Sequence, residues 1–155
     1  MTNRKDFLQN EFPKLLQNLT AETKGNFGLM TPQHMVEHLT WVIKSTLKGV
    51  GVHEMPLTEK QKGFRKFIDK GAILKHRPSD KTKDDLPDLK YGSLEEAMEQ
   101  IPIAVNRFYE WKEANPDGEI FAPFTGHMPI EKWELFHYSH VRYHLWQFGL
   151  LPEYP

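Results

Sequence analysis

Two histidines lie one helical turn apart in the last amphipathic segment of the chain, at positions 140 and 144. In an α-helix, residues i and i+4 project from the same side, so His140 and His144 can direct their ring nitrogens at a single point. This HxxxH spacing is the half-site that a helix contributes to many zinc proteins. The pair therefore indicates a metal ion bound through imidazole nitrogens.

Other polar side chains share the apolar face of the same segment. His137 and Gln147 occupy positions that a helical bundle would normally fill with leucine. Burying an imidazole or an amide costs free energy unless the group finds a hydrogen-bonding partner. We interpret His137 as a candidate for lining a pocket, with a place near the bundle end as the alternative. Gln147 is a candidate for binding a ligand imidazole or a substrate, with an amide bonded to the backbone as the alternative.

A stable metal site needs a third protein ligand, and the best candidate is His38. It lies on the flank of the apolar stripe in residues 31–47, one turn before Val42. His34 precedes it by one turn and points further from the stripe, so we assign His34 to the pocket. Three neutral imidazoles with an open position are typical of a catalytic metal centre that activates water. For each histidine the alternative is a core residue bonded to a carbonyl.

The absence of cysteine restricts the chemistry. No thiolate site or disulfide can form, so a metal must take nitrogen or oxygen ligands. We expect Zn²⁺ or Ni²⁺, with Fe²⁺ or Mn²⁺ as alternatives, because nitrogen ligands alone do not separate these metals. A di-iron centre requires two Glu-x-x-His motifs, and only Glu134 with His137 matches. Haem between two facing histidines is the remaining alternative, and nothing in the sequence favours it.

Bulk properties indicate an ordinary globular protein. The chain has 155 residues and a formal net charge of −1, which predicts a single domain over residues 1–155 and no general attraction to nucleic acid or membrane. We interpret the basic stretch at residues 60–77 as a solvated helix face, since aspartates that follow offset its charge. No apolar run could span a bilayer, and the N-terminus lacks the apolar core of a secretory signal. Cytoplasmic residence is therefore expected.

Hydrophobic periodicity predicts five helical segments and no strand. They cover residues 2–19, 31–47, 58–74, 93–114 and 129–149. Thr31 before a proline, and Ser93 with a glutamate three residues later, are signals for helix starts. Pro13 and Pro102 are expected to bend or split their helices. Four long helices and one short extra helix predict an all-α fold, a four-helix bundle.

Two blocks of the sequence resemble DinB-like (YfiT-like) proteins. Residues 27–39, FGLMTPQHMVEHL, resemble the start of the second helix of that superfamily. Residues 126–149, especially EKW, YSH and HLWQFG, resemble its last helix. The nearest pattern is an uncharacterised subfamily with a histidine-rich last helix followed by Gln-Phe-Gly. The subfamily often has histidine at the position of Tyr143, and histidine at the position of Ala122, which precedes Pro123.

The resemblance implies a four-helix bundle that holds a divalent metal through three histidines, which carry over to His38, His140 and His144. The wider superfamily includes metal-dependent hydrolases and transferases that use low-molecular-weight thiols, and many members are homodimers. The leading hypothesis is therefore a metal-dependent hydrolase or thiol transferase that acts on a small molecule. A non-catalytic binding or scaffold protein with a vestigial pocket is the alternative.

Overall fold

The computed structural model describes residues 3–52, 56–71 and 81–153. Lys75 and Arg77 of the basic stretch lie outside the described residues. The helix expected at 58–74 ends earlier than predicted, at Asp69, and a turn follows at residues 70–71. The chain forms, in order, α1 (Arg4–Asp6), a π-helical turn (Phe7–Glu11), α2 (Phe12–Leu16), α3 (Pro32–Thr46), a 3₁₀ turn (Leu47–Gly49), α4 (Glu59–Asp69), a second 3₁₀ turn (Lys83–Asp85), α5 (Leu94–Ala114), β1 (Glu119–Ala122), β2 (Gly126–Pro129) and α6 (Ile130–Gln147). The fold is mostly helical, as the periodicity predicts.

The expectation that no strand is present is wrong, because a β-hairpin precedes α6. Strands β1 and β2 pair antiparallel, with Ala122 opposite Gly126. Each strand has four residues, which is too short to leave a clear alternating pattern. Gly126 has a φ of +66°, a conformation that glycine adopts without steric cost at the turn. The Trp133 indole N–H donates to the Ile120 carbonyl at 3.1 Å, which fixes the hairpin to α6.

Capping residues start α3 and α5 where the sequence predicts. The Thr31 hydroxyl accepts a hydrogen bond from the His34 backbone N–H at 3.2 Å, and Ser93 accepts one from Glu96 at 3.1 Å. Helix α5 continues through Pro102. At the N-terminus the chain forms the π-helical turn immediately before Pro13, where a ring without an N–H would disturb α-helical bonding.

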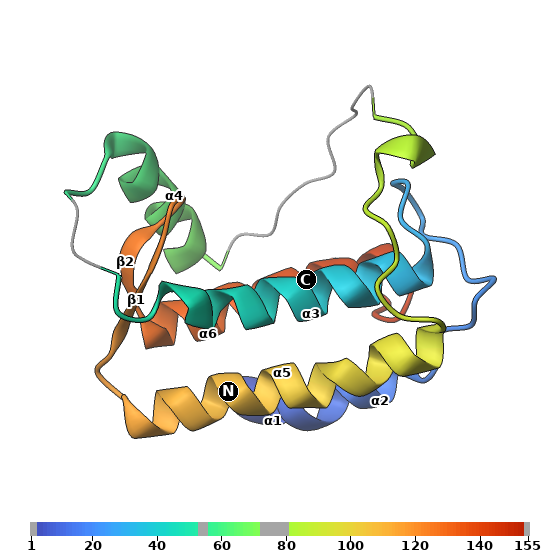
Figure 1. The fold of residues 1–155 in the computed structure, drawn as a ribbon, viewed down its shortest axis with the longest axis horizontal. Helices are drawn as coiled ribbons and strands as arrows, with labels where there is room; N and C mark the ends of the chain where they lie inside the picture. Colours follow the sequence, from blue (N-terminus) through green and yellow to red (C-terminus); the bar gives the residue numbers. More distant parts are fainter. Residues whose placement is uncertain (1–2, 53–55, 72–80, 154–155) are drawn as a thin grey trace.

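The long helices lie side by side with their axes roughly parallel, and α1 and α2 run along α5 (Figure 1). Helix α6 contacts α1, α2, α3, α4 and β2. As a result, α6 is buried around most of its circumference. Glu134 and Ser139, which do not lie on the helix face of His140 and His144, are also buried. Glu134 lies 3.6 Å from the guanidinium of Arg4. No helix in the described part of the chain is both long and apolar enough to cross a bilayer.

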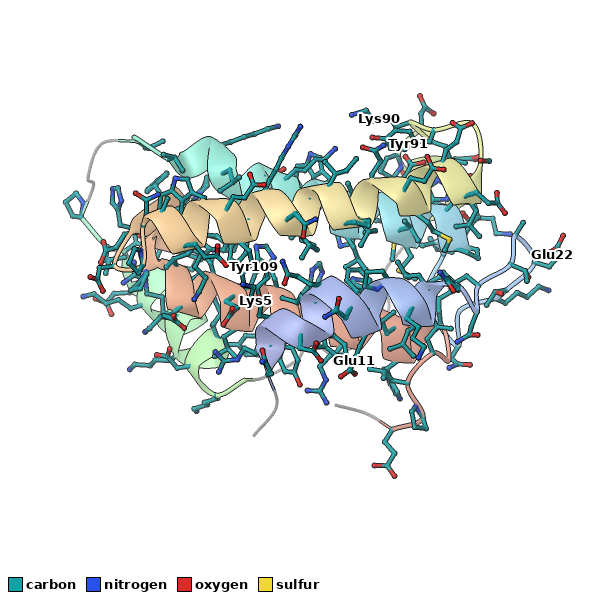
Figure 2. The ribbon with its side chains drawn as sticks, turned by 90° about the horizontal axis from the view of Figure 1, so that it is seen from below. Lys5, Glu11, Glu22, Lys90, Tyr91 and Tyr109 are labelled. Carbon is teal, nitrogen blue, oxygen red and sulfur yellow. The ribbon has the colours of Figure 1, made fainter. Side chains whose placement is uncertain are left out.

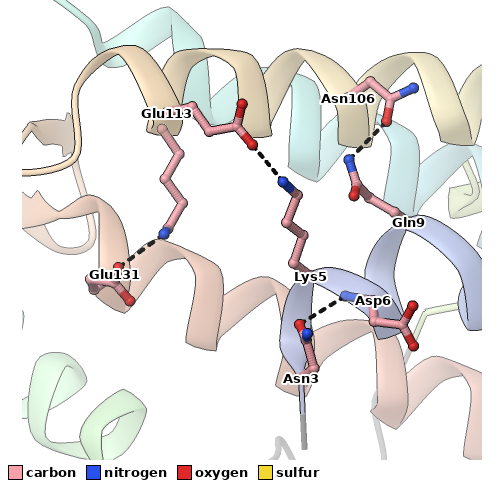
Figure 3. A network of polar contacts seen from close by, with 8 residues as sticks. Asn3, Lys5, Asp6, Gln9, Asn106, Glu113 and Glu131 are labelled. Atoms are coloured by element: carbon pink, nitrogen blue, oxygen red, sulfur yellow. Dashed lines mark hydrogen bonds and ion pairs between the residues drawn. The ribbon is translucent and has the colours of Figure 1, made fainter.

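Polar contacts at the surface join the N-terminal segment to α5, and α5 to α6. Lys5 pairs with Glu113, and Lys112 pairs with Glu131 at 2.9 Å (Figure 3). The Lys5 ammonium also lies 5.6 Å from the centre of the Tyr109 ring (Figure 2). Exposed ion pairs contribute about 0–1 kcal/mol each. The apolar core between the helices therefore provides most of the stability.

Substitution of Gly49 tests how closely the hairpin packs against the end of α3. It ends the 3₁₀ turn after α3, where a Cβ atom would overlap the backbone oxygen of Phe121. We expect Gly49→Ala to lower the free energy of unfolding by about 1–3 kcal/mol, because the hairpin must move away. Gly63→Ala, within α4 and with no atom within 4 Å of its Cβ, should raise it by about 0.5–1 kcal/mol. Denaturant titration measures both, and equal effects would contradict this packing.

Candidate metal centre

Three imidazoles from two helices meet inside the fold. The His140 Nε2 atom lies 3.2 Å from Nε2 of His38 and 3.1 Å from Nε2 of His144. One candidate ligand atom from each of the three residues lies within 4.8 Å of the other two. Helix α3 supplies His38, whereas α6 supplies the other two from consecutive turns. The structure thus brings together the three residues that the sequence predicts as metal ligands.

The spacing of these nitrogens fits a single small cation. Zinc binds imidazole nitrogen at about 2.0–2.1 Å, and two nitrogens in a tetrahedral site then lie about 3.3 Å apart. The separations of 3.2 and 3.1 Å at His140 are close to that value. The candidate atoms of His38 and His144 lie within 4.8 Å of each other, so these two rings would close up around one ion.

Gln147 fixes the tautomer of His144. The Gln147 amide donates from Nε2 to the Phe27 carbonyl at 2.9 Å, so its oxygen faces the other way. That oxygen lies 2.7 Å from His144 Nδ1, which must therefore carry the ring hydrogen and donate it. The Nε2 atom of His144 is left with a lone pair directed at the cluster. This is the arrangement that a metal-binding imidazole requires.

The hydrogen bonds within the cluster cannot all be satisfied by the protein alone. Because His144 Nε2 has no hydrogen, it can only accept from His140. If His140 Nε2 carries the hydrogen and donates it to His144, then His140 Nε2 has no lone pair with which to accept from His38. If His140 Nε2 carries no hydrogen, its contact with His144 brings two lone pairs together. At most one of the two short contacts is a hydrogen bond. A cation would satisfy all three nitrogens together, which is an observation in favour of a metal.

Burial keeps the three imidazoles neutral near pH 7. It lowers the pKa of His38, and it lowers the pKa of His144 to about 4. The pKa of His140 is held well below its usual range by burial and by the neighbouring His144, His38 and His137. Neutral rings have lone pairs available, so no proton has to be displaced when a metal binds at that pH.

Aromatic rings surround the cluster. Phe136 stacks on His140 with the ring centres 5.5 Å apart and an angle of 11°. Tyr143 meets the His144 ring edge to face at 5.0 Å. These contacts restrict the orientations of the two imidazoles and place apolar surface against them.

His137 lies apart from the three clustered nitrogens and binds Thr46. Its Nε2 atom is 2.8 Å from the Thr46 hydroxyl, whose own hydrogen is directed to the Val42 carbonyl at 3.2 Å. The imidazole is buried and stacks on Trp133 with ring centres 6.0 Å apart. The structure buries His137 one turn before His140, and its role in lining a pocket stays a prediction.

His34 lines a cavity together with His38. Its Nε2 donates to the Pro87 carbonyl at 3.0 Å, and its Nδ1 accepts from the Thr31 hydroxyl at 2.7 Å. Both ring nitrogens are thus engaged by the protein. This fits a residue that shapes the wall of a pocket, and the binding role of His34 stays a prediction.

Sequence reasoning missed the residues that join distant segments at the site. Glu37 accepts hydrogen bonds from the backbone N–H of Lys90 at 2.6 Å and of Tyr91 at 3.3 Å, which holds that segment against α3. The Phe27 carbonyl that orients Gln147 carries no side-chain signal at all. Thr46 did carry one, because it is a polar residue within the apolar stripe of its helix, as the histidines are.

Comparisons of the chain with family models, with curated proteins and with solved structures found no significant match. The family resemblance of the sequence therefore stays a prediction. The geometry of the three imidazoles does not depend on it.

Replacing Gln147 tests its role in orienting His144. Gln147→Leu removes the acceptor from Nδ1, so we expect zinc affinity to fall about 10–100-fold. Gln147→Glu keeps an acceptor for His144 Nδ1 and should lose less zinc affinity. Competition with a chromophoric chelator measures both affinities. Unchanged affinity in Gln147→Leu would contradict this role.

The buried His137 should make the metal-free protein sensitive to acid. Burial lowers the pKa of His137 from 6.5 to about 3, so the unfolded chain takes up the proton first as the pH falls. The stability associated with the neutral ring is complete above pH 6.5 and is lost toward pH 3. In His137→Leu, the slope of unfolding free energy against pH between about 6 and 4.5 should be smaller by about 1.4 kcal/mol per pH unit. Urea titrations across that range measure it, and an unchanged slope would refute the assignment.

Proposed function

We propose that this protein is a metal-dependent enzyme whose divalent ion is held by His38, His140 and His144. The observation that carries the proposal is the convergence of three neutral imidazole nitrogens from α3 and α6, with more lone pairs than the protein can satisfy. A divalent ion bound there supplies Lewis-acid chemistry, which suits hydrolysis or the activation of a thiol. Zn²⁺ or Ni²⁺ is the proposed metal, with Fe²⁺ and Mn²⁺ as alternatives.

The protein's own residues position the ligands and shield them. Gln147 holds the His144 ring in one tautomer, and Phe136 stacks on the His140 ring. All three ligands are protein nitrogens, which leaves room in a four-coordinate site for one exogenous group. This is the arrangement of catalytic rather than purely structural metal sites.

The proposal includes the DinB-like superfamily as the family and the four-helix bundle as the architecture. The two sequence blocks that resemble the superfamily carry all three proposed ligands. The parallel packing of α3, α5 and α6 with the α1–α2 segment supports the same architecture (Figure 1). We propose a cytoplasmic protein that acts on a small molecule, as a hydrolase or a low-molecular-weight-thiol transferase, and that forms a homodimer.

Metal analysis tests the proposal. The full chain without an affinity tag should bind about one Zn²⁺ or Ni²⁺ per protomer, as measured by mass spectrometry of the metal after dialysis. Zinc at 100 times its dissociation constant should raise the free energy of unfolding by about 2.7 kcal/mol, since it binds only the folded state. His38→Ala, His140→Ala and His144→Ala should each lose the metal.

The matched control is His34→Ala, which removes an imidazole from the same helix as His38 but should retain the metal. A protein that neither retains a metal nor gains stability with zinc or nickel would contradict the proposal and favour a scaffold. For a protein that binds metal, a screen of ester and amide hydrolysis and of thiol conjugation tests catalysis. Turnover should require the metal and should be lost in His144→Ala.

A further inference from the structure

A groove runs along α3, beside the cluster of three imidazoles. Its cavity volume is about 620 Å³, and residues 86–88, 90 and 91 contribute to the opposite wall. The groove is lined, among others, by His38, Trp41, Lys44, Lys48, Lys90 and Tyr91. We call this cavity the α3 groove. His38 belongs to both the groove and the cluster of imidazoles, so the two are adjacent.

One part of the α3 groove is rich in cations without anionic partners. The Lys44 ammonium donates to the neutral side-chain oxygen of Gln100 at 3.3 Å. Burial, Lys90 and Arg107 lower the pKa of Lys44, so these cations lie near one another. Among the described residues, no carboxylate pairs with Lys44, Lys48 or Lys90. An anion bound there would reduce the repulsion between the cations.

The carboxylates of the groove do not neutralise these lysines. Both oxygens of Glu37 accept hydrogen bonds from the backbone of residues 90 and 91, and one of them also binds the Gln33 amide. These neutral donors stabilise the carboxylate, and neither Lys44, Lys48 nor Lys90 lies within ion-pair distance of it. Asp88, the other carboxylate of the lining, is exposed to solvent.

The same groove offers an aromatic surface. Trp41 is 63% exposed although it lies in the middle of α3, and no ring of the described residues stacks on it. Tyr91 lies shortly before α5, next to Lys90 (Figure 2). The Lys90 ammonium is 5.7 Å from the centre of the Tyr91 ring. Apolar walls with a few charged groups are typical of small-molecule sites. Along the helix, His38 and Lys44 are separated by about 9 Å, which is the length of a small organic molecule.

We propose that the α3 groove binds a small organic anion, whose flat apolar body packs on Trp41 and whose anionic group pairs with Lys44 and Lys90. Through His38 the groove borders the proposed metal centre, and we assign small organic anions as the substrate class of that centre. This assignment rests on the proposed function. The binding itself depends only on the groove.

Calorimetric titration with a matched pair of probes tests the inference. We use 2-naphthoate and its uncharged analogue 2-naphthamide, with the full chain kept metal-free by a chelator. The naphthoate should bind with a stoichiometry of about one and at least about fivefold more tightly than the amide. Lys44→Met and Lys90→Met should each weaken naphthoate binding about fivefold and leave the amide unchanged. Trp41→Ala should weaken the binding of both probes.

Lys14→Met, a substitution of an exposed lysine on α2, is the control and should change neither affinity. Equal binding of the two probes, no binding of either, or equal effects of Lys44→Met and Lys14→Met would overturn the inference. So would naphthoate binding that appears only with zinc and vanishes in His144→Ala, since the metal would then be the anion site. Naphthoate binding by a chain that fails to bind zinc would support the groove while removing the proposed function.

Discussion

The structure depends on burying neutral imidazoles between two helices that are about a hundred residues apart in the sequence. His38 on α3 and the pair on α6 are partly or fully buried, and burial lowers the pKa of each. Removing these rings from water costs free energy that apolar side chains would not cost. The packing of α3 against α6 can tolerate that cost only if the nitrogens find partners, and the cluster itself can form at most one of its two short contacts as a hydrogen bond. A cation bound between the three rings would resolve this constraint.

Much of the remaining architecture can be understood as support for that packing. The hairpin leads directly into α6 and is attached to it through Trp133. Gln147, one turn after His144, connects the end of α6 to the loop before α3 through the Phe27 carbonyl and the Asn26 backbone N–H. Glu37 holds residues 90 and 91 against α3, and these residues in turn form a wall of the α3 groove. Gln147 therefore orients one imidazole of the cluster, and Glu37 shapes the adjacent groove from which a small molecule would approach it.

The parts of the fold and site that local chemistry determines could be predicted from the sequence. Thr31 and Ser93 cap their helices, and the spacing of His140 and His144 follows from the helical repeat. His38 could be selected because it lies at the flank of an apolar stripe. The hairpin was missed because four-residue strands leave no periodic signal. The bonds from Thr46 to His137 and from Gln147 to Phe27 join residues about a hundred positions apart, and only the tertiary packing brings them together. For the same reason, the sequence could not show that Glu134 would be buried.

We propose that one cation sits between the three imidazoles. Diffraction from crystals of the zinc-loaded chain, recorded at the zinc absorption edge, locates that ion directly. We expect one strong anomalous peak about 2.0–2.1 Å from Nε2 of His38, His140 and His144, with Gln147 still bonded to His144. A zinc peak at another position, or three separated imidazole rings with no peak between them, would contradict a metal site at this cluster.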